Sequence, residues 1–95
     1  MEKKIAEVWD AADFLDDEET MAAYLSACLA DGDEELLRAA LNDVARAKGM
    51  TQLAKETGVT RDGLYKALAP GGNPSFATVR KVLAALGLRL DVVPA

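Results

Sequence analysis

Histidine is absent from this chain of 95 residues, and cysteine occurs once, at Cys28. Imidazole and thiolate groups are the usual protein ligands of transition metals, so the chain cannot assemble such a ligand set. No serine or cysteine stands beside a plausible general base, and Gly71-Gly72 lacks the lysine and the serine or threonine of a phosphate-binding loop. We therefore expect no catalytic site, no metal, no cofactor and no small-molecule substrate.

Long apolar segments are absent too. No run of hydrophobic residues approaches the length that spans a bilayer, and no basic and apolar leader is present. The sequence therefore predicts a soluble, cytoplasmic protein with no membrane partner. A lone cysteine cannot form an internal disulfide. Because Cys28 falls in an amphipathic pattern, we interpret it as a buried structural thiol rather than a reactive one.

Alanine and leucine dominate what the chain does contain. Hydrophobic residues make up 51% of it, whereas aromatic residues make up only 5%. This composition is typical of helices that pack through small side chains. The length allows one modest core but not two, so we expect one small and mainly helical domain.

The net charge of −5 is unevenly distributed. Residues 1–49 contain 13 acidic and 5 basic side chains, whereas residues 50–95 contain 3 acidic and 6 basic ones. Such an asymmetry indicates that the two halves have different partners. The basic half suits contact with the phosphates of a nucleic acid, and the acidic half suits a basic protein.

Two short helices joined by a tight turn are predicted for residues 50–68. Thr51 has the side chain to cap the first helix, and Gly58 stands where that helix must stop and reverse with a positive φ. Thr60 can cap the second helix, whose inner face includes Leu64. This is the pattern of a helix-turn-helix, in which the second helix lies in the DNA major groove.

Within this stretch, Leu53-Ala54, Gly58-Val59-Thr60 and Leu64 resemble the Cro and phage-repressor type of helix-turn-helix. The longer run GMTQLAKETGVTRDGLYKALAPGGNPSFATVRKVLAALGLRL resembles the addiction-module antidote proteins, antitoxins of the HigA-like class. The upstream run DAADFLDDEETMAAYLSACLADGD is similar to the amino-terminal half of that family. The resemblance implies an antitoxin of a type II toxin–antitoxin module that neutralises a small basic RelE/ParE-type toxin and represses its own operon. The alternative is a stand-alone prophage-type transcriptional repressor with no toxin partner.

The expected fold is mainly all-α: a five-helix repressor-like helix-turn-helix domain with an N-terminal helical extension and a short C-terminal β-strand. Residues 1–32 would form an arm and an acidic helix, the expected toxin-contact region. Residues 33–95 would form the Cro/repressor-like DNA-binding region. We expect the two regions to pack into one compact domain.

Capping residues and periodicity place the remaining helices. Asp16 or Asp17 can cap a helix that reaches Asp31, and Asp33 can cap the next helix, which Gly49 stops. A last helix follows the loop APGGNPS and should be stopped by a glycine. The stripes expected to be buried are Met21, Tyr24, Leu25, Cys28 and Leu29 in the first helix and Phe76, Val79, Val82, Leu83 and Leu86 in the last.

Residues 88–93 read Leu-Arg-Leu-Asp-Val-Val, which predicts a strand with Leu88, Leu90 and Val92 on one side. A lone strand leaves its backbone unpaired, so it needs a neighbour. Within the chain the candidate is the arm at residues 4–9, which otherwise covers the core with Trp9 or contacts a partner. Pairing of this strand between two chains is our hypothesis for a homodimer.

The residues expected to contact operator DNA are Thr51, Gln52, Lys55, Thr60, Arg61, Asp62, Tyr65, Lys66, Asn73 and Ser75. Arg61 can form a bidentate pair with guanine, whereas Asp62 can accept only from a base amino group and repels phosphate. Lys55 and Lys66 suit phosphate. Tyr65 can contact DNA or lie half-buried against the loop, and outside this context the whole set would be interpreted as an ordinary solvated face.

Gly63 falls in the middle of the second helix, where glycine costs about 1 kcal/mol relative to alanine. A close approach of the backbone to DNA would explain it, and so would simple tolerance.

The residues expected to contact the toxin are Asp16, Asp17, Glu18 and Glu19, with Tyr24 nearby. Four consecutive carboxylates would attract a basic protein. They also suit a well-capped helix start with a solvated face, because a helix dipole favours acidic residues in its first turn. The sequence leaves both interpretations open.

Overall fold

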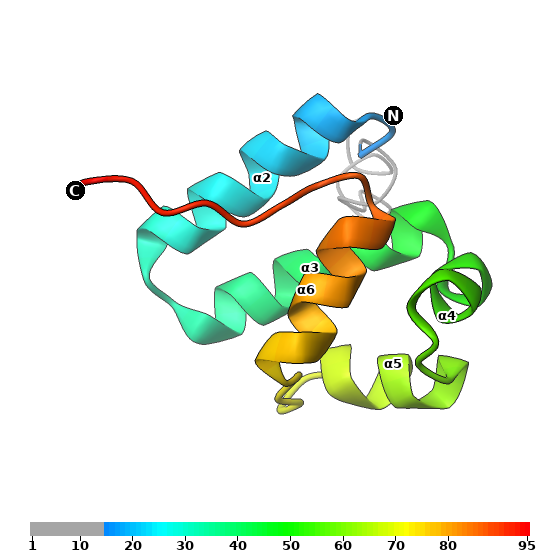
Figure 1. Ribbon diagram of the computed structural model, residues 1–95. Coiled ribbons are helices and arrows are strands. Elements are labelled where there is room, and N and C mark those ends of the chain that lie inside the picture. Colours follow the sequence, from blue (N-terminus) through cyan, green and yellow to red (C-terminus); the bar gives the residue numbers. More distant parts are fainter. Residues whose placement is uncertain (1–14) are drawn as a thin grey trace, which may run out of the picture.

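The computed structural model describes residues 15–95, and within that range every regular element is a helix (Figure 1). The helices are α2 (Glu18–Asp31), α3 (Glu34–Lys48), α4 (Met50–Thr57), α5 (Arg61–Leu68) and α6 (Phe76–Ala85). Helices α2 and α3 form an antiparallel pair (Figure 1). Helices α4 and α5 pack against α3, and α6 packs against α4. The all-α prediction is confirmed. No helix in this range is long and apolar enough to cross a membrane.

Side-chain caps begin four of the five helices where the sequence predicted them. Asp17 accepts a hydrogen bond from the Thr20 amide, and Asp33 accepts from two amides of the first turn of α3. Thr60 caps α5 and Ser75 caps α6 in the same way. Each cap satisfies amide groups that have no partner within their own helix.

The cap predicted for Thr51 is wrong. Helix α4 begins at Met50 with Gly49 in the cap position, and no side chain accepts a hydrogen bond there. Gly49 ends α3 and starts α4 at once, with a φ of 107° that glycine tolerates. The single-residue connection leaves Thr51 exposed inside the first turn.

Helix α3 is at the centre of the core. Its Ala40, Val44 and Ala45 side chains are completely buried, and the small alanines let neighbouring helices approach closely. The largest fully buried side chains of the described range are Leu53, Leu64, Leu68, Val44 and Val82, drawn from four helices. Cys28 is buried on α2, and burial raises the pKa of its thiol. That environment fits the structural role predicted for it.

Arg38 is the buried charged residue of this core, and the sequence analysis did not predict its burial. Its guanidinium donates to the Leu68 carbonyl oxygen at the end of α5 and, within α3, to the Glu35 carboxylate at 2.6 and 3.0 Å. Ala69, which follows α5, is extended, so no left-handed residue closes this helix end. Arg38 therefore satisfies one of the carbonyls that the end of α5 leaves open.

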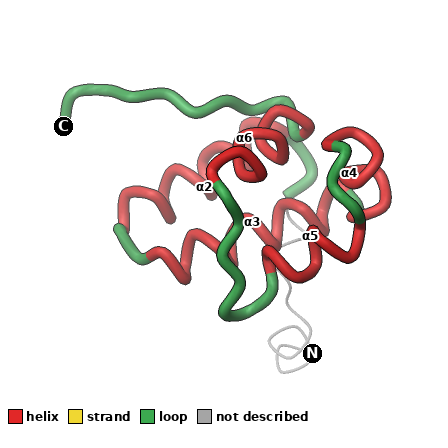
Figure 2. The backbone as a smooth tube through the Cα atoms, turned by 60° about the horizontal axis from the view of Figure 1, so that its bottom comes forward, coloured by secondary structure: helices red, strands yellow, loops and turns green. Residues whose placement is uncertain are grey.

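The predicted C-terminal β-strand is wrong for the described residues. After Gly87 the chain continues beyond α6, and residues 88–95 form no strand (Figure 2). Leu88 packs partly against the core, whereas Leu90 and Val92 are exposed. A strand needs a second strand beside it, and this part of the fold offers only helices. The arm at residues 4–9, the other predicted neighbour, lies outside the described residues.

Replacing Arg38 tests its contribution to stability. Arg38→Met keeps an apolar stem but leaves the Leu68 carbonyl without its partner, so we expect a loss of about 2 kcal/mol in the free energy of unfolding. Urea denaturation followed by circular dichroism measures it. Glu34→Gln is the control, because Glu34 is exposed on the same helix and forms no ion pair within the described residues, and it should move the midpoint far less. Equal shifts for the two variants would contradict this assignment.

Candidate nucleic-acid interface

Helices α4 and α5 are joined by a short turn in the stretch where the sequence predicted a helix-turn-helix. Gly58 ends α4 with a φ of 75°, and its amide donates to the Ala54 carbonyl. Val59 packs partly against the core, and α5 buries Leu64 and Leu68. Burial of that side of α5 turns its opposite side to solvent. The loop before α6 lies on the same side of the molecule as α5 (Figure 1).

Four exposed side chains of α5 pair with one another. Lys66 Nζ lies 3.1 Å from Asp62 Oδ2, and both side chains are more than three-quarters exposed. The Arg61 guanidinium lies over the Tyr65 ring, 5.4 Å from its centroid, and Nη2 is 3.4 Å from the phenolic oxygen. Tyr65 is therefore exposed beside Arg61 rather than half-buried against the loop. In the free protein, each predicted base-reading residue already has a partner.

The structure gives a local reason for glycine at position 63, and it differs from both interpretations made from the sequence. A Cβ at this position would lie 2.9 Å from Thr60 Oγ1, the atom that caps α5, and 3.4 Å from a methyl group of Val59. A residue with a side chain here would therefore require the Thr60 hydroxyl to shift from its present position. The glycine costs helix propensity but preserves the hydrogen bond that begins the helix.

The other predicted DNA contacts come from α4 and the loop. Thr51, Gln52 and Lys55 are exposed on α4, where the Gln52 amide donates to Glu56 and Lys55 forms no ion pair within residues 15–95. Asn73 is exposed in the loop. The Ser75 hydroxyl accepts from Thr78 N and lies 3.0 Å from the Thr78 hydroxyl, so it is already engaged.

The loop is held against α5 by a close backbone contact. A Cβ on Gly72 would collide with the carbonyl oxygens of Lys66 and Ala67, so only glycine fits there. The Gly72 amide also donates to the Ala69 carbonyl at 2.7 Å. The loop and the exposed side of α5 are thus placed together, as contact with one stretch of DNA backbone would require.

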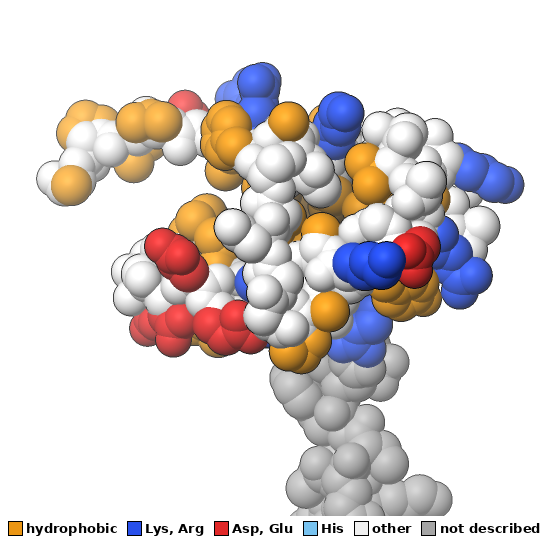
Figure 3. All heavy atoms as spheres, turned by 90° about the horizontal axis from the view of Figure 1, so that it is seen from below, with side chains coloured by type: hydrophobic (Ala, Val, Ile, Leu, Met, Phe, Trp, Pro, Cys, Tyr) orange, Lys and Arg blue, Asp and Glu red, His pale blue; other side chains and the backbone are white. Residues whose placement is uncertain are grey.

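Charge is separated across the surface as the sequence suggested. In Figure 3, Lys and Arg side chains gather over the α4–α5 side, whereas Asp and Glu side chains gather at the turn between α2 and α3. Asp31, Asp33, Glu34 and Glu35 at this turn are all exposed.

The predicted acidic cluster at the start of α2 has several local roles. Asp17 is the cap, and hydrogen bonds from Thr20 hold the pKa of its carboxyl below the ordinary value. The Glu18 carboxylate lies against Gly87, while Asp16 and Glu19 are exposed.

Tyr24 is directed away from that cluster. Its hydroxyl donates to Asp43 Oδ2 on α3 at 2.6 Å, and the side chain is half-buried between the two helices. Burial and this hydrogen bond raise the pKa of Tyr24. Asp43 also pairs with Arg46 at 2.6 Å, so these residues tie α2 to α3.

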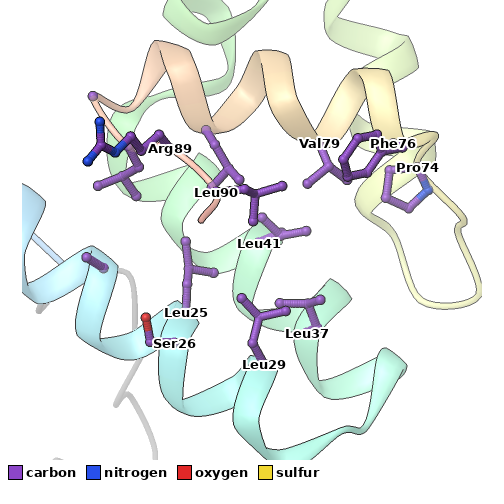
Figure 4. A pocket seen from close by; sticks show the side chains of 14 residues that line it. Leu25, Ser26, Leu29, Leu37, Leu41, Pro74, Phe76, Val79, Arg89 and Leu90 are labelled. Carbon is purple, nitrogen blue, oxygen red and sulfur yellow. The ribbon is translucent and has the colours of Figure 1, made fainter. Parts of the chain in front are cut away.

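An apolar groove of about 670 Å³ was missed by the sequence analysis. It lies between α2 and α3 on one side and α6 and the following chain on the other (Figure 4). Leu29 and Phe76, predicted to be buried, are instead 48% and 68% exposed and line this groove. Helical periodicity places residues on one face but does not show whether another element covers that face. The sequence did hold one signal for the groove: α2 has apolar residues, Ala22 and Leu29, beside its main buried stripe.

The fold and this surface define a small all-helical domain in which two short helices are joined by a tight turn. Residues 5–94 match the model of a family described as "Probable addiction module antidote protein", and the chain belongs to that family. It is 48% identical over 84 residues to an uncharacterised protein of Haemophilus influenzae, covering 88% of this chain and 87% of that protein. No solved structure matches the chain.

A double-mutant cycle tests the link between Thr60 and Gly63. Gly63→Ala should not stabilise the protein while Thr60 is present, because the new methyl group displaces the cap. In a Thr60→Ala background, which itself costs about 1 kcal/mol, the same change should stabilise by about 0.5 kcal/mol through helix propensity. Thermal unfolding of all four proteins measures it. An equal effect of Gly63→Ala in both backgrounds would contradict the link.

Proposed function

We propose that this chain is the antitoxin of a two-component addiction module, which binds a toxin and represses its own operon by binding operator DNA. Family membership supports the antitoxin role. The exposed side of α5 supports the DNA-binding role, because two buried leucines and Arg38 hold this helix while its amino-terminal residues point to solvent. In a helix-turn-helix these residues reach the base edges.

Operator recognition would require an exchange of partners on α5. Arg61 would leave the Tyr65 ring to donate two hydrogen bonds to guanine, and Lys66 would leave Asp62 for a phosphate. Asp62 would then need a new donor, such as the amino group of cytosine. At a site without that donor, the carboxylate stays unpaired beside phosphates, so Asp62 adds selectivity at the expense of affinity.

A homodimer fits this function. One copy presents few phosphate-directed cations, so useful affinity would need two copies on half-sites about 34 Å apart. The chain after α6 exposes Leu90 and Val92 and belongs to no helix or strand of the described residues. Pairing of residues 88–93 across a two-fold axis would join the copies.

The toxin would bind to the acidic half of the chain. Its exposed carboxylates favour a basic partner, in keeping with a small RelE/ParE-type toxin. Asp16 and Glu19 at the start of α2 are available to such a partner, and the cytoplasm is where both the operator and the toxin would be met.

The test is a pull-down of the tagged chain co-expressed with its adjacent gene product, eluted with and without promoter DNA. Recovery of a small basic protein and of the promoter would support both roles. Promoter binding without any protein partner would leave a stand-alone repressor and contradict the antitoxin role.

Arg61→Gln tests base reading. Losing a bidentate contact with guanine should weaken operator binding by about 1–3 kcal/mol, roughly 5- to 150-fold, as measured by fluorescence anisotropy at constant salt. Arg80→Gln removes the same charge from the exposed side of α6 and should change affinity by less than about twofold. If the two variants lost operator affinity equally, Arg61 would contribute only its charge and would not read a base.

Deleting residues 89–95 tests the dimer. We expect a monomer in analytical ultracentrifugation and a much weaker complex with the two-half-site operator. A deletion variant that sediments as a dimer would rule out pairing through this segment.

A further inference from the structure

The apolar groove has a closed floor and an open rim. Leu25, Leu41 and Leu83 are buried at its base, where they also belong to the hydrophobic core. Leu29 and Phe76 stand on opposite walls and remain largely exposed, as Figure 4 shows. The groove therefore combines a rigid base with apolar side chains that lie in contact with water.

Helix α2 presents two apolar faces. Met21, Leu25 and Cys28 face the core, as expected of one stripe. Ala22 and Leu29 lie beside that stripe and line the groove. A surface helix of a monomeric domain normally has a single apolar stripe, and a contiguous apolar hollow marks a site of interaction. The second face of α2 indicates that the groove binds another molecule.

Exposed carboxylates lie close in sequence to residues that line the groove. Asp31 follows the lining residue Leu29 by two positions and Glu34 precedes the lining residue Leu37 by three, and both carboxylates are exposed and form no ion pair within the described range. The Glu18 carboxylate lies against Gly87, which also lines the groove. Arg89 is the single charged residue among the lining side chains. The complementary ligand is therefore an apolar segment with lysine or arginine residues beside it.

A second copy of this chain fits the groove less well than a basic protein does. The apolar segment that the chain itself exposes, residues 88–93, contains one arginine and one aspartate, so it brings no surplus positive charge to the flanking carboxylates. Those same carboxylates would repel the phosphates of a nucleic acid. An antidote, however, has a toxin as its protein partner.

We propose that the antidote binds its toxin through this groove, which receives an apolar toxin segment flanked by lysine or arginine side chains. The proposal rests on the antitoxin function proposed above and adds the site and the chemistry of the partner.

Leu29→Gln and Phe76→Gln test the groove, with Leu36→Gln as the matched control. Leu36 is 40% exposed on α3 and does not line the groove, whereas Leu29 is 48% exposed. The probe is the purified protein encoded by the adjacent gene, and its affinity is measured by isothermal titration calorimetry. We expect both groove variants to bind at least tenfold more weakly and the control to stay within twofold. Leu29→Gln should bind promoter DNA as the unmodified chain does.

Glu34→Gln tests the flanking charge against Glu56→Gln, which neutralises an exposed carboxylate on α4. Glu34→Gln should weaken toxin binding about threefold at low salt and lose this effect at high salt. Glu56→Gln should have no effect on the toxin.

The outcomes separate the proposal from the function on which it rests. Unchanged toxin affinity in both folded groove variants would overturn the groove as the site and leave the antitoxin function intact. Loss of the dimer without loss of toxin binding would also overturn it, because the occupant would then be a second copy. Failure of the unmodified chain to bind the adjacent gene product would overturn both.

Discussion

The hydrogen bond from Arg38 to the Leu68 carbonyl fixes the position of α5 in the fold. A guanidinium buried in a small core must keep its partners, since an unpaired buried charge is far more costly than a neutral side chain. Glu35 neutralises Arg38 from the same helix, so Leu68 is the contact that reaches across. Helix α5 cannot slide along α3 without breaking that contact. The exposed side of α5 therefore faces solvent in a direction that the Arg38–Leu68 hydrogen bond, on the buried side of the helix, helps to set.

The same central helix organises the acidic half. Tyr24 and Asp43 tie α2 to α3, and Gly49 joins α3 to α4 through one residue. Both candidate binding surfaces are therefore built on α3. The caps and turn glycines each act on residues only a few positions away. In contrast, the Tyr24–Asp43 and Arg38–Leu68 hydrogen bonds join residues that are 19 and 30 positions apart.

Local features of the fold could be predicted from the sequence. Asp17, Asp33, Thr60 and Ser75 begin their helices as expected, because a capping side chain bonds amides two or three positions away. The cap at Thr51 failed because one glycine serves two helices. Features that depend on distant neighbours were missed: Arg38 has its partner on another helix, and the exposure of Leu29 and Phe76 depends on what packs above them. Gly63 was misread because its constraint is the cap hydroxyl.

Leu37 and Arg38 are adjacent on α3, but they face different surfaces. Leu37 lines the groove, and Arg38 holds the end of α5. A ligand that displaced α3 at the groove would thus act on the residue that positions α5, the helix proposed to read the operator. In the proposed module, thermodynamic linkage would make any such coupling reciprocal: toxin binding would change operator affinity by the same factor by which operator binding changed toxin affinity. Helix α3 would then connect the two proposed binding sites.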